Sequence, residues 1–279
     1  MSFTLAKTAF VLSGGGAKGC YQVGVMKQLL EKGIKPDVIY GTSTGSLQAS
    51  GYAKLGITGL EQTWLSIKSR SDIMAYNWWP HILTLGLTLD GKYNFNPLKK
   101  KLEFIQSLPG EQHCEVVVTK VSLKTGEIRY CKYSDQDFID SVLASCSVPF
   151  VNTPIQGEWV DGGVRDQIPV AKVLNDDYDK VIFIINNPVH INPPDPWKKP
   201  AVLPMLSILI RVADGILSTE TWLDELRVIQ KMQKEGKNVE VYMPEEYWMD
   251  TQDYIPAKIR QGIEMGYKAK PIDLTQLEL

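Results

Sequence analysis

The sequence predicts an α/β protein built around a mainly parallel β-sheet. Two observations support this prediction. Strand and helix signals alternate through the first 56 residues, an order typical of parallel strands joined by right-handed crossovers. The runs TAFVL (8–12) and KVIFIINN (180–187) are short and almost entirely apolar, as expected of strands that are buried on both faces.

The N-terminal elements follow from apolar spacing and from the glycines that end them. Apolar residues recur at helical spacing over residues 19–32, and Gly33 is a natural stop for that helix. DVIYG (37–41) is a second short strand. It runs into a helix expected over residues 44–55 and closed by Gly56.

The remaining elements continue the alternation. EVVVTKVSL (115–123) and GEIRYCKY (126–133) are predicted strands joined at Lys124-Thr125-Gly126 as a hairpin. The later elements are a short helix at 136–144, a strand at 180–187, one long helix or two abutting helices at 205–235, a strand at 238–244 and a helix at 256–268.

Two segments fit neither helical nor strand periodicity. The absence of a repeat or a low-complexity linker predicts one domain over residues 1–279, with irregular insertions near 70–98 and 187–204. The first insertion contains Trp78, Trp79 and Leu83. These three are candidate substrate-binding residues in an acyl-binding lid or a membrane-contact surface, because Trp suits an interface with one wet side. The alternative is that they cover the main core.

Composition narrows the classes of function. A formal net charge of −2 gives no basis for nucleic-acid binding, which requires a basic patch. The four cysteines show neither a C-x-x-C pair nor metal-ligand spacing, so no metal is predicted and buried, reduced thiols are expected. Without a signal peptide or an apolar run of about 20 residues, the expected location is cytoplasmic, with transient contact with membrane surfaces possible. The oligomeric state does not follow from the sequence.

The stretch SGGGAKG (13–19) contains Gly14, Gly16 and Gly19 at the G-x-G-x-x-G spacing of dinucleotide-binding folds. Such folds place an acidic residue at the carboxyl end of the second strand, where this chain has Ile39-Tyr40-Gly41. A Walker loop is excluded as well, since no G-K-[ST] follows the glycines. The loop is therefore expected to hold some other oxyanion, and no cofactor is predicted.

A second glycine motif explains the first. GTSTG (41–45) matches G-x-S-x-G between a predicted strand and a predicted helix, where a sharp turn presents a serine nucleophile. The alternative is that Ser43 merely caps the helix. In a parallel sheet the loop after the first strand opens beside the loop after the second, so Gly14, Gly15 and Gly16 are expected to supply an oxyanion hole next to Ser43.

The general base is left open by these arguments. His190 follows a predicted strand and lies after Asp161 in the Ser…Asp…His order of α/β-hydrolases. Asp161 itself ends a short apolar run before two glycines, although an Asp-Gly dipeptide is most often a simple turn. Both residues remain candidates.

Taken together, five blocks resemble the patatin-like phospholipase family, and they span nearly the whole chain. They are SGGGAKG (13–19), GTSTG (41–45), ASCSVPF (144–150), DGG (161–163) and PAKIRQGIEMGYKA (256–269). The resemblance implies a three-layer α/β/α fold related to α/β-hydrolases and a Ser–Asp dyad without histidine. Ser43 is then the nucleophile and Asp161 the base, with an oxyanion hole around Gly15 and Gly16. The matching motif residues are Lys18, Gly19, Gly41, Gly45, Gly162 and Gly163.

The function implied by the resemblance is metal-independent hydrolysis of carboxylic esters of lipids, of the phospholipase A or lysophospholipase type. One alternative is a soluble carboxylesterase or thioesterase that acts on acyl groups outside membranes. A further alternative is a non-catalytic binding module, against which the intact Ser43, Asp161 and glycine loop argue. The segment 57–112 matches the family only loosely, so the substrate is not specified.

Overall fold

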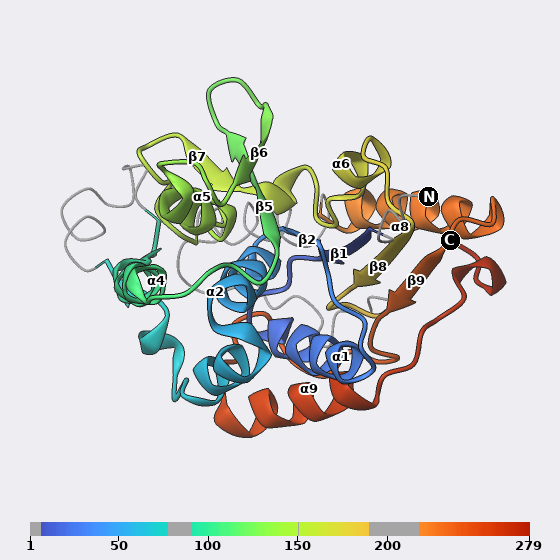
Figure 1. Cartoon of the computed structure of the whole chain (residues 1–279). Coiled ribbons are helices and arrows are strands. Elements are labelled where there is room, and N and C mark those ends of the chain that lie inside the picture. The colour runs from blue at the N-terminus through green and yellow to red at the C-terminus, as the bar shows by residue number, and fades with distance from the viewer. Residues whose placement is uncertain (1–6, 78–90, 150, 190–217) are drawn as a thin grey trace, which may run out of the picture.

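The computed structural model describes residues 7–77, 91–149, 151–189 and 218–279 (Figure 1). Within these ranges, the strands of the main sheet lie in the order β6-β5-β2-β1-β8-β9, and β7 pairs with β5. The strands are β1 (Thr8–Leu12), β2 (Val38–Gly41), β5 (Glu115–Ser122), β6 (Ile128–Lys132), β7 (Trp159–Asp161), β8 (Lys180–Ile184) and β9 (Val239–Tyr242).

The sheet is mainly parallel, as predicted. β1 pairs in parallel with β2 and β8, β2 with β5, and β8 with β9. Only β6 and β7 run antiparallel to their neighbour β5 within the main sheet described. The predicted hairpin between residues 115 and 133 is confirmed as the β5–β6 pair.

Helices cover both faces of the sheet and make a three-layer α/β/α arrangement (Figure 1). α1 (Cys20–Glu31), α2 (Thr44–Leu65) and α9 (Pro256–Lys268) lie on one face, together with α4 (Asn96–Ser107) and α5 (Phe138–Ser145). α6 (Val170–Leu174) and α8 (Ser218–Lys234) lie on the other face. Successive side chains of β1 point to opposite faces of the sheet and so contribute to both helical layers. Phe10 packs toward the first group of helices and Val11 toward the second.

The register of β5 brings two distant segments together. β6 pairs with Val117–Val121 and so occupies one edge of β5. β2 pairs with residues 115–118 and β7 with residues 120–122, so these two strands share the other edge. β7 therefore continues along β5 where β2 stops at Gly41, and Asp161 lies opposite Lys120, just beyond the end of β2.

The backbone of α2 is interrupted at Gly56, the glycine at which the sequence predicts a helix end. Gly56 has φ 65° and ψ −176°, which are not helical values, so the helix that begins at Thr44 ends here as predicted. A second helical segment continues beyond this kink to Leu65. The two segments pack together through Trp64, which is buried and donates its Nε1 to Gln48 Oε1 at 2.7 Å.

The insertion predicted to be irregular near 70–98 contains regular structure where it is described. The short 3₁₀ turn Arg70–Asp72 precedes β3 (Ala75–Tyr76), which pairs with β4 (Tyr93–Asn94) in a two-stranded ribbon. α4 follows, beginning with a proline in its first turn and burying Leu98 and Leu102. Most of its other positions are polar, so α4 is amphipathic and turns its apolar side toward the core.

Candidate active site

Ser43 occupies a strained turn between β2 and α2. Its backbone has φ 54° and ψ −124°, a conformation that residues with a side chain rarely adopt. It is also the N-cap residue of a 22-residue helix, whose N-terminus favours negative charge. A strained serine at such a helix start is the arrangement of a nucleophile elbow.

The two glycines of the motif allow the elbow to form. A Cβ on Gly41 would lie 2.4 Å from the Gly45 carbonyl oxygen. A Cβ on Gly45 would lie 2.3 Å from the Leu12 carbonyl oxygen. Strand β2, helix α2 and strand β1 therefore approach one another too closely for any side chain at these positions.

The glycine loop 14–16 lies directly beside Ser43. A Cβ on Gly14 would be 3.2 Å from the Ser43 Cβ. Gly15 and Gly16 have φ of 154° and 57°, values that glycine adopts readily. The Gly14 N–H donates to the Gln167 carbonyl at 3.1 Å, whereas among the described residues no acceptor is found for the N–H groups of Gly15 and Gly16. Among the described residues, these two N–H groups are therefore left available to a bound group.

Buried amide side chains hold the loop in place. Asn186 Nδ2 donates to the carbonyls of Ser13 and Gly14, each at 3.2 Å. Gln22 Nε2 donates to the Ser13 carbonyl at 2.9 Å and to the Ile184 carbonyl at 3.0 Å. Neither residue was singled out from the sequence, since a lone buried amide carries no local signal.

Asp161 ends β7 and is 4% exposed. Its Oδ1 accepts the Gly163 N–H at 2.7 Å, which orients the carboxylate. A Cβ on Gly162 would lie 2.2 Å from the Thr119 hydroxyl oxygen, so this position requires glycine for close packing against β5. The DGG block thus shapes the carboxylate's surroundings instead of forming a simple exposed turn.

Residues 145–147, at the C-terminal end of α5 and just beyond it, form hydrogen bonds with both Ser43 and Asp161. The Ser145 hydroxyl accepts the Ser43 N–H at 2.9 Å, and the Ser147 carbonyl accepts the Asp161 N–H at 2.9 Å. Between them, the Cys146 thiol donates to the Ser43 carbonyl at 3.2 Å. Burial, and then the charge of Asp161, raise the pKa of this thiol. The small-residue block noted in the sequence therefore has a specific structural role, which the sequence did not reveal.

One cavity of about 380 Å³ contains both candidate residues. Its polar end is formed by the glycine loop, Ser43, Asp161 and Gly163. Much of the remaining wall is apolar and includes Leu47, Ile73, Leu98 and Tyr254. These four also line a second space of about 60 Å³ between α2 and α4. The cavity thus combines a reactive polar end with apolar walls, as ligand sites commonly do.

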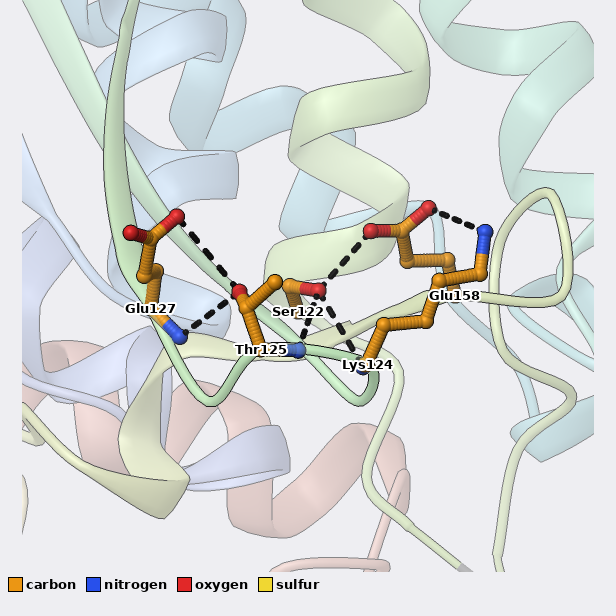
Figure 2. A network of polar contacts seen from close by, with 5 residues as sticks. All are labelled: Ser122, Lys124, Thr125, Glu127 and Glu158. Atoms are coloured by element: carbon orange, nitrogen blue, oxygen red, sulfur yellow. Dashed lines mark hydrogen bonds and ion pairs between the residues drawn. The ribbon is translucent and has the colours of Figure 1, made fainter.

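An ordered turn forms part of the cavity rim. Ser122 Oγ accepts the N–H groups of Lys124 and Thr125 and donates to Glu158, and Lys124 Nζ pairs with Glu158 Oε2 at 2.8 Å (Figure 2). The intervening Leu123 lines the cavity although its side chain is 50% exposed. The β5–β6 turn therefore presents an apolar side chain to solvent beside the opening.

The other predicted site residues differ in their placement. Lys18 is buried, donates to Asn187 Oδ1 and lies 5.1 Å from the centre of the Tyr247 ring. These contacts anchor the start of α1 to the end of β8. Trp78, Trp79, Leu83 and His190 lie outside the described residues.

The sequence also makes predictions about the cysteines, possible metal ligands and helix lengths. Cys20, Cys114, Cys131 and Cys146 are buried free thiols, as the sequence predicts. Within the described ranges, no group of three or more His, Cys, Asp or Glu side chains has a metal-binding arrangement. None of the helices in those ranges has the length and apolarity needed to cross a membrane.

Comparison with known sequences identifies a matching protein family and related proteins. A family model described as Patatin-like phospholipase matches residues 10–174. A Patatin-like phospholipase domain-containing protein of Pyricularia oryzae is 26% identical over 239 residues, covering 69% of this chain and 28% of the relative. Patatin-like phospholipase domain-containing protein 7 of Rattus norvegicus is 50% identical over 46 residues, which cover 16% of this chain and 3% of that protein. The chain spans only a minor part of the length of these relatives.

Solved structures show weaker similarity. VipD from Legionella pneumophila aligns with a TM-score of 0.45 and 14% identity, covering 94% of this chain and 65% of that one. Full-length ExoU of the type III secretion system of Pseudomonas aeruginosa, in complex with full-length SpcU, aligns with a TM-score of 0.38 and 15% identity. That alignment covers 82% of this chain and 52% of the other.

Proposed function

Since this chain belongs to the patatin-like phospholipase family, we propose that it hydrolyses carboxylic esters of lipids through an acyl-Ser43 intermediate. Asp161 serves as the general base, and the N–H groups of Gly15 and Gly16 stabilise the oxyanion. The single observation that carries the proposal is the shared cavity. A strained serine, a buried carboxylate and a glycine loop with two available donors all line it.

The proposed reaction has two balanced halves. In the first half, Ser43 Oγ attacks the ester carbonyl carbon while Asp161 takes the hydroxyl proton, and the carbonyl electrons move onto the oxygen. The Gly15 and Gly16 N–H groups bind that oxyanion. The carbon–oxygen bond of the ester then breaks, the alcohol leaves with the proton held by Asp161, and the acyl group remains on Ser43.

In the second half, water attacks the acyl-Ser43 carbonyl and Asp161 takes a proton from it. Collapse of the second tetrahedral intermediate releases the fatty acid and returns the proton to Ser43. Asp161 suits this exchange because the Gly163 N–H orients its carboxylate. Its backbone is held separately, since the Ser147 carbonyl accepts the Asp161 N–H. No metal or cofactor takes part in the proposed steps.

The apolar wall supports an acyl chain as the part of the substrate held in the cavity. Leu47 follows Ser43 by one helical turn on α2 and faces both the main cavity and the smaller space beyond it. An acyl chain that enters from Ser43 meets apolar side chains along this path, and each buried methylene contributes about 0.8 kcal/mol. The alcohol part of the ester then lies toward the opening, near Leu123.

Product analysis tests the proposal directly. The protein is incubated with vesicles of long-chain phosphatidylcholine and lysophosphatidylcholine and, separately, with short-chain soluble esters and thioesters. Release of free fatty acid from either lipid, identified by mass spectrometry, supports a lipid acyl hydrolase. Turnover of soluble esters or thioesters alone favours the soluble esterase or thioesterase, and no turnover of any substrate favours a binding module.

Filling the cavity at Leu47 is expected to change chain-length preference. Leu47→Trp places a large side chain across the apolar path while leaving Ser43 and Asp161 in position. We expect kcat/KM for a long-chain nitrophenyl ester to fall on the order of 100-fold, and that for the acetyl ester to change only a few fold.

Leu65→Trp is the matched control, because Leu65 lies on the same helix but is 44% exposed and lines neither cavity. It should leave both rates unchanged. Equal losses on long and short esters in Leu47→Trp would show that the acyl chain binds elsewhere.

A further inference from the structure

Two buried carboxyl groups lie behind the active site. Asp166 is 3% exposed and Glu225, on α8, is 6% exposed. Glu225 lies against the chain directly after Asp166, because its carboxyl group accepts the Gln167 N–H. Buried carboxyl groups need such contacts to replace the water that they lose.

Glu225 uses both of its oxygens to hold the backbone that follows the DGG block. Oε1 accepts the Gln167 N–H at 2.7 Å, and Oε2 accepts the Ile168 N–H at 2.9 Å. These contacts cross from a helix on one face of the sheet to the segment at the edge of the active site.

The carbonyl groups of the same segment reach the two loops that carry the proposed chemistry. The Asp166 carbonyl accepts the Thr42 hydroxyl at 3.0 Å, immediately before Ser43. The Gln167 carbonyl accepts the Gly14 N–H at 3.1 Å, immediately before the proposed oxyanion donors. The N–H groups of segment 166–168 thus donate to Glu225. Its carbonyl groups accept hydrogen bonds from the glycine loop and from the turn before Ser43.

We propose that Glu225 is a positioning residue for the active site, and that its hydrogen bonds to the backbone N–H groups of Gln167 and Ile168 keep segment 166–168, the glycine loop and the turn before Ser43 in register. The inference rests on the proposed function, since it assigns a role in the same reaction. Glu225 does not line the cavity and acts through the backbone of Gln167.

The surroundings of the pair determine its response to pH. Tyr130 on β6 donates its hydroxyl to Asp166 Oδ2 at 2.7 Å. Burial raises the pKa of this tyrosine, and the charge of nearby Arg165 partly opposes that rise. Burial raises the pKa of Asp166 above the usual carboxyl value, and burial together with the charge of Asp166 raises that of Glu225 still further.

The sign of the pH effect follows from these shifts. The folded protein retains a proton that the unfolded chain releases in the ordinary carboxyl range, so stability falls as the pH rises through the raised pKa of Glu225. Above that pKa the two carboxylates repel each other, and segment 166–168 loses its hold. The activity is therefore expected to show an alkaline decline that originates in this pair.

The test compares Glu225→Ala with a matched variant on the same helix. Gln230 is 9% exposed, and its side chain donates to the carbonyls of Leu274 and Leu277, away from the cavity. Both Ala variants remove two side-chain contacts to backbone from α8. We expect Glu225→Ala to lower kcat on the order of 100-fold with little change in KM, and Gln230→Ala to keep wild-type kcat.

Asp166→Asn keeps the shape and hydrogen-bonding capacity of the side chain but removes its ionisable group. The Asn amide can donate to Glu225 while its oxygen still accepts from Tyr130. The alkaline decline of kcat should therefore disappear in this variant, whereas a purely structural role would leave the profile unchanged. An unaltered alkaline limb in Asp166→Asn, or equal kcat in the two Ala variants, would overturn the inference.

Hydrogen exchange separates this inference from the proposed function. Faster amide exchange in the peptide spanning the glycine loop is expected in Glu225→Ala but not in Gln230→Ala, whether or not any ester is turned over. If the wild type hydrolyses no ester, the proposed function fails, and the exchange result still decides the positioning role. Unchanged exchange in the loop of a folded Glu225→Ala, or of Glu225→Gln should the Ala variant not fold, contradicts it.

Discussion

Asp161→Asn is expected to lower kcat by about 10²- to 10⁴-fold, because the amide keeps the shape of the carboxylate but cannot accept the Ser43 proton. The backbone should be unaffected. The amide oxygen can still accept the Gly163 N–H, and the Asp161 N–H bond to Ser147 does not involve the side chain. Steady-state hydrolysis of a nitrophenyl ester, together with a thermal melt to confirm folding, measures the effect.

His190→Ala is the control for this prediction. The sequence left His190 as an alternative base, and it lies outside the described residues. A Ser–Asp dyad predicts that this variant retains most of the activity. Near-complete inactivation of a properly folded His190→Ala, with substantial activity left in Asp161→Asn, would replace the dyad with a mechanism that uses histidine.

Gly15→Ala is expected to reduce kcat by about 100- to 1,000-fold through loss of the oxyanion donors. The new Cβ would lie 2.7 Å from the Asn186 Cβ, at a φ of 154° that alanine does not adopt readily. Either the loop or Asn186 must move, and Asn186 is the residue that holds the Gly14 carbonyl. The rate of acylation should fall while the affinity for substrate changes little.

Gly33→Ala separates backbone strain from catalysis. Gly33 follows α1 with a φ of 80°, and a Cβ there would meet nothing within 4 Å. This variant should lose about 1 kcal/mol of stability and keep wild-type kcat. Similar activity losses in Gly15→Ala and Gly33→Ala, in proportion to their melting temperatures, would mean that strain alone explains the effect.

The features that the sequence predicted are those with local causes. The positive φ values of Gly15 and Gly16 and the close approach of Gly41 to Gly45 arise within a few residues, so a glycine motif in the sequence indicates them. The parallel core strands are likewise visible as apolar runs. For these reasons the three-layer fold and the elbow geometry followed from the motifs and the resemblance that they support.

The features that the sequence did not predict depend on distant contacts. The meeting of Asp161 with the Ser43 turn is set by the register of β7 on β5. The hydrogen bond from Ser43 to Ser145 spans 102 positions, and the bond from Gln167 to Glu225 spans 58. The helical segment of α2 beyond Gly56 likewise depends on a packing contact, since Trp64 is buried and donates to Gln48 on the other side of the kink.

Covalent labelling is the most direct test of whether Ser43 is the nucleophile. The wild-type protein is treated with a fluorophosphonate probe and digested, and the modified peptide is identified by mass spectrometry alongside Ser43→Ala. We expect one phosphonylated residue, Ser43, with esterase activity lost in step with labelling and no labelling of the folded Ala variant. Labelling at another serine in Ser43→Ala, with esterase activity retained, would contradict this assignment.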